Sequence, residues 1–209
     1  MNERSVRPLI AETGRRNESV ILNAALDIFG ERGFNGASMR DIARRAGTAL
    51  SNLYNYFPAK ADLLAELLRR ANDELLRRTT EAVASVPDGD PARALAAAVR
   101  AYVGFVVDHQ TAALVALSEM RYLKDEQRAS VVRARDSTQA IFEKLVGEGA
   151  ARGVFHTPHP ADAARNIVAQ CSAISTWYRP DGRLSADALA GQHARYALAM
   201  LEAEMPEPG

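Results

Sequence analysis

The residues best suited to chemistry lie close together in residues 50–57. A helix that buries Leu53 and Phe57, four residues apart, turns Ser51 and Asn55 outward. In the major groove of DNA, asparagine pairs with adenine, serine bonds either kind of base edge, and leucine contacts the thymine methyl group. We therefore predict base contacts from Leu50, Ser51 and Asn55.

Groups able to hold a phosphate backbone surround this segment. Ser38 opens a helix whose free amides suit an anion, Tyr56 carries a phenol hydrogen, and Lys60 is a cation. Taken singly, such tyrosines more often pack against a core and such a lysine is a solvated surface charge. Further positive charge, part of which only solvates a helix, comes from Arg40, Arg44 and Arg45, and two residues are placed to reach the minor groove: Arg15 and Arg16.

Short helices must position these residues. The first carries an apolar face through Phe29 and ends at Gly33, a candidate left-handed cap. Ser38 and Asp41 fit a capping box for the second helix, which Gly47 ends after two turns. The third helix begins near Leu50, so the pattern is helix, tight turn, helix.

The rest of the chain also has helical periodicity, and no strand-like alternation persists. We predict an all-α protein, with six longer helices at about 59–86, 91–107, 110–120, 124–151, 160–178 and 185–204. The charge divides similarly: residues 1–60 have a net charge of +3 and residues 61–209 of −3, within a neutral chain of 209 residues. The basic end favours a polyanion partner.

The spacing of these residues closely resembles the DNA-binding domain of the TetR family of transcriptional regulators. The similar segments are Ala24–Phe29, Gly33-Phe34, Ser38, Asp41–Ala43, Ala46-Gly47, Leu53-Tyr54, Tyr56-Phe57 and Lys60. The resemblance implies a three-helix helix-turn-helix domain at 1–58, ordered from about residue 15, and a six-helix effector-binding and dimerisation domain at 59–209. It also implies phosphate contacts from Ser38, Tyr54, Tyr56 and Lys60.

One position departs from the family pattern. The family usually has Ser or Thr where Ala49 stands, as N-cap of the recognition helix. Either Thr48 or Ser51 takes that role here, or the helix end is left to water.

The resemblance further implies a homodimer on a palindromic operator, released by an effector held in the C-terminal domain. We expect an apolar cavity lined by Val99, Tyr102, Val103, Val106, Leu117, Met120, Phe142, Leu145 and Trp177, although most apolar residues there are plain core. Small and apolar residues of the last two helices predict a dimer interface, with intramolecular packing as the alternative: Ala164, Ile167, Cys171, Ile174, Tyr196 and Met200.

The segments 149–155 and 177–185 resemble C-terminal domains of regulators that respond to acyl-CoA thioesters. This favours a small hydrophobic effector, an acyl-CoA or a fatty acid. Cations for the CoA phosphates are available at Arg121, Lys124, Arg128, Arg133 and Arg135, which equally suit a solvated helix face. The competing hypothesis is a dimeric DNA-binding protein that has no small ligand and is controlled by a protein partner.

No pattern for an enzyme is present: the chain has no inward Glu-x-x-His pair, Walker lysine loop or nucleophile elbow. We expect no cofactor and no metal site, since His156 and His159 lack partner ligands and Cys171 is placed for packing. Without a secretory apolar segment or about 18 unbroken apolar residues, we expect a cytoplasmic protein with no membrane partner.

Overall fold

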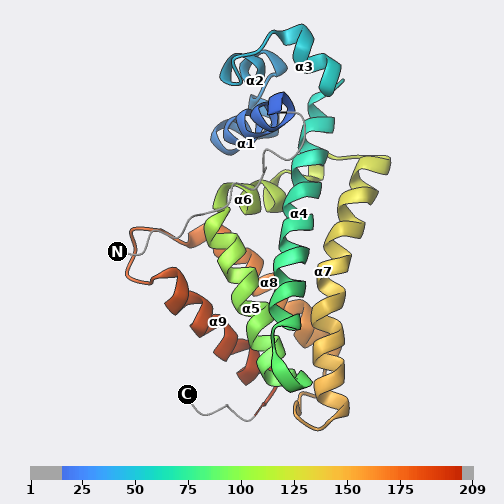
Figure 1. Ribbon diagram of the computed structural model, residues 1–209, viewed down its shortest axis with the longest axis vertical. Helices are drawn as coiled ribbons and strands as arrows, with labels where there is room; N and C mark the ends of the chain where they lie inside the picture. The colour runs from blue at the N-terminus through green and yellow to red at the C-terminus, as the bar shows by residue number, and fades with distance from the viewer. Residues whose placement is uncertain (1–15, 204–209) are drawn as a thin grey trace. The chain divides into compact units, whose positions relative to one another are not determined.

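The computed structural model describes residues 16–203, in which the ordered elements are nine α-helices and two 3-10 helices, with no strand (Figure 1). This confirms the predicted all-α class, and the long helices lie within a few residues of their predicted ranges. The elements are α1 (Arg16–Gly36), α2 (Met39–Arg45), α3 (Leu50–Tyr56), α4 (Lys60–Ala84), η1 (Pro87–Gly89), α5 (Pro91–Asp108), α6 (Gln110–Ser118), η2 (Met120–Tyr122), α7 (Asp125–Ala151), α8 (Pro160–Trp177) and α9 (Ala186–Met200).

The described residues form two compact units. Unit 1 holds the residues up to Asp73 and the segment His109–Arg133, and unit 2 holds Glu74–Asp108 and the residues from Ala134 onward. Helices α4 and α7 therefore each contribute to both units. The segment His109–Arg133, predicted to be part of the domain at 59–209, clusters with the N-terminal helices in unit 1.

The core of unit 1 is built from the apolar faces of its short helices. Leu22 and Phe29 of α1, Ile42 of α2 and Leu53 of α3 are buried in one cluster, which Val115 of α6 joins. Helix α2 contacts both α1 and α3, and α6 packs against α1. Burial of this apolar surface holds α3 at a fixed angle within the unit.

Two glycines permit the path of α1. Gly33 has φ of 67°, a left-handed conformation that ends the regular helix, as predicted. At Gly30 a Cβ atom would lie 2.5 Å from the Thr111 Cγ2, so any larger residue would require the Thr111 side chain to shift.

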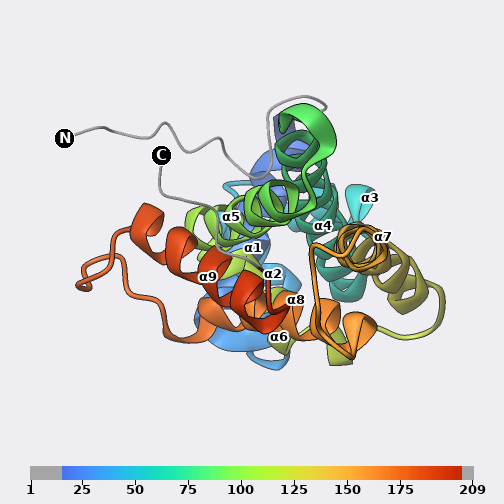
Figure 2. The same cartoon turned by 90° about the horizontal axis from the view of Figure 1, so that it is seen from below.

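Unit 2 is organised around α5, which packs against α8 and α9 (Figure 2). Val99 and Val103 of α5, Ile174 of α8 and Leu198 of α9 are each at most 3% exposed. Ser185 caps α9 by accepting a hydrogen bond from the Ala188 amide at 3.2 Å, as the sequence predicted.

Candidate nucleic-acid interface

Helix α3 is held from one side only. Leu53 is fully buried and Phe57, its C-cap, is 7% exposed, so these two residues anchor the helix in the core of unit 1. The opposite face carries Ser51, Tyr54 and Asn55, which are all exposed, Tyr54 by 46%. This face has no charged group, so contacts from it depend on hydrogen bonds and shape rather than on net charge.

Two other predicted contact residues are only half-buried. Leu50 and Tyr56 pack against the core cluster of unit 1 while part of each side chain remains accessible. Tyr56 is therefore partly a packing residue, and its phosphate contact stays a prediction. Leu50 lies at the first turn of α3, beside Ser51.

The N-terminus of α3 has no side-chain cap. Ala49 is the N-cap residue and no side chain accepts from the first-turn amides, so neither Thr48 nor Ser51 takes the role. Thr48 instead accepts a hydrogen bond from the Asn52 side-chain amide at 2.8 Å. Of the options that the sequence left open, an end without a side-chain cap is the one the structure has.

Helix α2 begins with the predicted capping box. The Asp41 amide donates to the Ser38 hydroxyl oxygen at 3.1 Å, and that hydroxyl donates to the Asp41 carboxylate at 2.5 Å. The bond from Ser38, opposed by partial burial and aided by Arg32 and Arg44, lowers the pKa of Asp41. The hydroxyl hydrogen of Ser38 is therefore already donated within the protein.

The three arginines of α2 differ in their partners. Arg44 pairs with Asp41 on its own helix, and Arg45 donates to the Glu31 carboxylate of α1 at 2.9 Å. Arg40 is exposed and has no hydrogen bond or ion pair to any described residue. Arg40 is thus the α2 cation that is available to an external anion.

Lys60, a predicted phosphate contact, is partly committed to the turn between α1 and α2. Its ammonium donates to the backbone carbonyls of Phe34 at 2.5 Å and Ala37 at 2.7 Å, and lies 4.4 Å from the centre of the Phe34 ring. Partial burial lowers the pKa of Lys60. One of its three hydrogens remains for another acceptor.

A second set of contacts to this turn comes from η2 and was not anticipated from the sequence. The buried carboxylate of Glu119 accepts from the Phe34 amide at 2.8 Å, and the Tyr122 hydroxyl accepts from the Asn35 side chain at 3.0 Å. The rings of Phe34 and Tyr122 also stack, with centroids 5.1 Å apart. No local pattern signals these contacts, because their partners lie about 85 positions apart.

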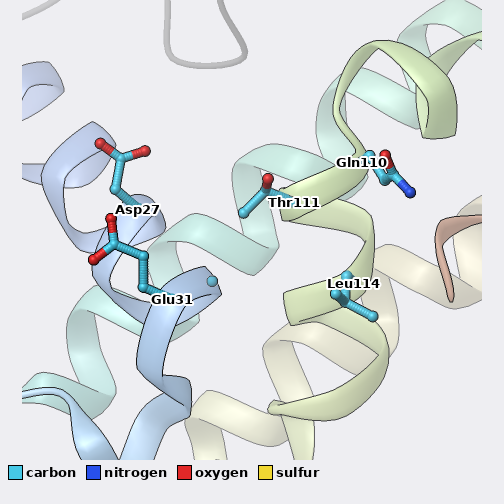
Figure 3. A pocket seen from close by; sticks show the side chains of 6 residues that line it. Asp27, Glu31, Gln110, Thr111 and Leu114 are labelled. Carbon is cyan, nitrogen blue, oxygen red and sulfur yellow. The ribbon is translucent and has the colours of Figure 1, made fainter. Parts of the chain in front are cut away.

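A hollow lies between α1 and α6 within unit 1. Figure 3 shows Asp27 and Glu31 projecting from α1, with Gln110, Thr111 and Leu114 on α6. Both carboxylates are paired: Arg45 bonds to Glu31 and lies 3.6 Å from Asp27. An acidic lining does not suit phosphate, so this hollow is not a part of the nucleic-acid interface.

The predicted minor-groove residues fall at the edge of the structure. Arg15 lies outside the described residues, and Arg16 is the first residue of α1. Their role stays a prediction.

The nine predicted cavity residues do not form one set. Six are buried in unit 2, namely Val99, Tyr102, Val103, Val106, Phe142 and Leu145. Leu117 on α6 and Trp177 at the end of α8 are 48% and 50% exposed, and Met120 packs against the core of unit 1. Leu117 and Trp177 thus lie on helix faces that periodicity alone predicted to be interior, whereas Met120 belongs to the interior of the other unit.

The six predicted dimer-interface residues differ in their exposure within the single chain. Four of its residues are at most 1% exposed within the single chain, because α8 packs against α5 and α9: Ala164, Ile167, Cys171 and Ile174. A side chain already removed from solvent has no surface to give to a partner. Burial also raises the pKa of the Cys171 thiol to about 12, which leaves it protonated and unreactive.

The accessible surface of α8 and α9 includes a small aromatic group. His193 stacks on Trp177 with centroids 6.3 Å apart and meets Tyr196 edge-on at 5.8 Å. Trp177 and Tyr196 are 50% and 54% exposed, and Met200 is half-buried. Partial burial lowers the pKa of His193. Of the six predicted interface residues, Tyr196 and Met200 keep accessible surface.

Two kinds of feature are absent from residues 16–203. No group of three His, Cys, Asp or Glu side chains in this part of the chain could hold a metal ion. None of its helices is both long and apolar enough to cross a membrane.

Two family models match the chain. "Bacterial regulatory proteins, tetR family" matches residues 21–67, which contain α2 and α3, and "Tetracyclin repressor-like, C-terminal domain" matches residues 88–201, more than half of the chain. The KstR2 transcriptional repressor of Mycobacterium tuberculosis H37Rv is 28% identical over 186 residues, covering 88% of this chain and 91% of that protein.

Solved structures show the same arrangement. A tetR-family regulator from Rhodococcus RHA1 superposes with a TM-score of 0.87 at 25% identity, over 92% of this chain and 100% of that one. AibR, in complex with isovaleryl coenzyme A and operator DNA, superposes with a TM-score of 0.78 at 22% identity, over 90% of this chain and 100% of that one. The second likeness concerns the fold alone.

Proposed function

The chain belongs to the TetR family of DNA-binding transcriptional regulators, and we propose that it represses genes from a palindromic operator until a small hydrophobic effector releases it. The observation that carries the proposal is the exposed, uncharged face of α3, which Leu53 and Phe57 hold from behind. A helix of this width enters the major groove with such a face toward the bases.

Base reading falls to three residues of α3. The Asn55 amide can pair with adenine through two hydrogen bonds, the Ser51 hydroxyl can bond either kind of base edge, and the accessible part of Leu50 can contact a thymine methyl group. Asn52 is not included, because its side-chain amide already donates to Thr48.

Backbone contacts come from Tyr54, Tyr56 and Arg40. Arg40 joins the residues named from the sequence because its guanidinium has no partner within the described residues. Lys60 contributes through its one remaining hydrogen, and Ser38 must rotate away from Asp41 before its hydroxyl can donate to a phosphate.

Two copies bind one operator. A single seven-residue reading helix contacts only a few base pairs, so specificity in a genome requires a second half-site. The half-sites are then about 34 to 36 Å apart, one turn of DNA. For the interface between copies we propose the accessible aromatic surface of α8 and α9, with Trp177, Tyr196 and Met200 in place of the four buried residues.

The effector binds in unit 2, and an acyl-CoA thioester is the proposed class. KstR2, a relative over most of the chain, is described as a ketosteroid transcriptional regulator, and AibR shares the fold and binds isovaleryl coenzyme A. Helices α4 and α7 contribute residues to both units, so they can transmit a change in unit 2 to unit 1. A coupling of about 1 to 3 kcal/mol is enough to release DNA several-fold or more.

Titration of the full-length protein on DNA from beside its own gene, with and without acyl-CoAs, tests this function. Asn55→Ala should lose about 1 to 3 kcal/mol on the operator and little on random DNA, because it removes a base contact. Arg40→Ala should weaken binding to both DNAs and reduce the salt slope by about one unit. Equal losses from Asn55→Ala on both DNAs would refute base reading by Asn55.

A further inference from the structure

Thr138 carries a buried hydroxyl that has no partner. It lies on α7 within unit 2 and is 3% exposed, and its Oγ1 makes no hydrogen bond to any of the described residues. Leaving such a group unsatisfied lowers the stability of the fold, whereas valine would fill the same space without that cost. The hydroxyl therefore calls for a reason beyond packing.

Other hydroxyls on helices of unit 2 form hydrogen bonds that the Thr138 hydroxyl lacks. Thr79 of α4, fully buried, donates to the Leu75 carbonyl one turn earlier at 2.8 Å, and Ser172 of α8 donates to the Val168 carbonyl at 2.9 Å. A threonine in a helix ordinarily satisfies itself in this way. The Thr138 hydroxyl makes no such bond to its own helix.

One turn beyond Thr138, α7 contacts an aromatic and polar group of unit 2. Phe142, one turn further along α7, meets the ring of Tyr102 edge-on, with centroids 6.0 Å apart. The Tyr102 hydroxyl lies 2.7 Å from the Ser172 hydroxyl. Because Ser172 donates its hydrogen to Val168, Tyr102 is the donor to Ser172, and its oxygen keeps capacity to accept.

A cation marks the outer end of this region. Arg135 is exposed, precedes Thr138 by one turn of α7, and lies close enough to Tyr102 to favour its ionised form. Burial nevertheless dominates and raises the pKa of Tyr102, so the phenol stays neutral. Along α7, the exposed cation of Arg135 is thus followed by the buried hydroxyl of Thr138 and then by the buried ring of Phe142.

We propose that the Thr138 hydroxyl donates a hydrogen bond to the carbonyl oxygen of the effector, an acyl thioester whose chain packs against Phe142 and whose anionic head lies toward Arg135. This inference rests on the proposed function and names the group of the effector that unit 2 recognises. A carbonyl supplies the missing acceptor, and a site built to bond a polar group discriminates strongly against an analogue that lacks it.

The test compares isovaleryl-CoA with its thioether analogue, in which a methylene replaces the carbonyl. Calorimetric titration of the wild type should give at least about tenfold tighter binding of the thioester, as a site bonded to a substrate oxygen does. Thr138→Val should bind the two probes within about twofold of one another, since no donor remains. The matched control Thr79→Val, also buried, should keep the wild-type preference.

Thermal unfolding adds a readout that separates this role from folding. Thr138→Val should raise the melting temperature, because it removes an unsatisfied group, whereas Thr79→Val should lower it. A Thr138→Val protein with raised stability and an unchanged thioester preference would overturn the inference.

Failure of the inference and failure of the proposed function are distinguishable on operator DNA. If thioester and thioether release the wild type equally, the inference is overturned and the effector class stands. If neither probe binds or releases the wild type, the inference and the acyl-CoA effector are both overturned, while sequence-specific binding to the operator remains to support DNA recognition.

Discussion

Unit 1 and unit 2 differ in how one polar group of each is satisfied. In unit 1, Glu119 and Lys60 both bond to the backbone of the turn between α1 and α2, so the chain satisfies that turn by itself. In unit 2, the hydroxyl of Thr138 has no partner among the described residues. This difference fits the proposed function, in which unit 1 presents the fixed face of α3 to DNA and unit 2 binds an effector.

The largest expected effect in unit 1 concerns Glu119. Glu119→Ala should lower the free energy of unfolding by about 2 to 3 kcal/mol, because it removes a charged acceptor and leaves the Phe34 amide unsatisfied. Chemical denaturation measures the loss. Glu126→Ala, at an exposed carboxylate on α7, is the control and should stay within about 0.5 kcal/mol of the wild type. Equal stability of the two variants would show that the bond from the Phe34 amide to Glu119 does not stabilise unit 1.

A smaller loss is expected at Lys60. Lys60→Met keeps most of the side-chain stem but deletes the ammonium that bonds to Phe34 and Ala37, and should cost about 1 to 2 kcal/mol of stability. Salt-dependent DNA titration then separates the two roles. A lost phosphate contact reduces the salt slope by about one unit, whereas a purely structural lysine leaves the slope unchanged.

The N-cap serines of α2 and α9 allow a direct comparison of the two units. Ser38→Ala at α2 and Ser185→Ala at α9 should each cost about 1 kcal/mol of stability, since each removes the acceptor for a first-turn amide. Operator affinity should fall only in Ser38→Ala, which perturbs the helix beside the reading face. Equal falls in affinity would mean that unit 2 influences DNA binding even without an effector.

The smallest expected effect is a pH dependence in unit 2. The hydrogen bond from Arg77, opposed by partial burial and aided by Arg78, lowers the pKa of Glu74 from 4.5 to about 2. A lowered pKa stabilises the fold above pH 4.5, and that contribution is lost as the pH falls toward 2. Glu74→Gln should flatten this acid limb by a few tenths of a kcal/mol, given the exposure of the pair.

The measurement for Glu74 is the unfolding free energy at several pH values. Glu143→Gln, at an exposed carboxylate of α7, is the matched control and should retain the acid limb of the wild type. An identical profile for Glu74→Gln would show that the pair with Arg77 is too well solvated to matter.

Local signals predicted the helix ends because their causes are local. The left-handed Gly33 and the caps at Ser38 and Ser185 each depend on atoms within about one helical turn, and the structure confirms all three. The exposed face of α3 followed in the same way, once Leu53 was recognised as the buried side of a short helix.

Contacts between residues far apart in the sequence could not be predicted from local signals. Helical periodicity reveals that the apolar face of α8 is covered, but not that the same chain covers it, so Ile167 and Cys171 were assigned to a dimer interface. Glu119 gave no signal, because its partner lies 85 positions away. Lys60 was predicted as a cation near DNA, and its bonds to two carbonyls depend on how α4 begins beside a distant turn.

The anchoring of α3 by Leu53 and Phe57 has an evolutionary consequence. The side chains that support the fold and those proposed to read bases are different residues of the same short helix, so exchange of Ser51 or Asn55 leaves the support intact. On the proposed function, a duplicated gene can therefore acquire a new regulon by one or two point changes. The same separation makes the scaffold suitable for engineered circuits in which several copies must ignore one another's promoters.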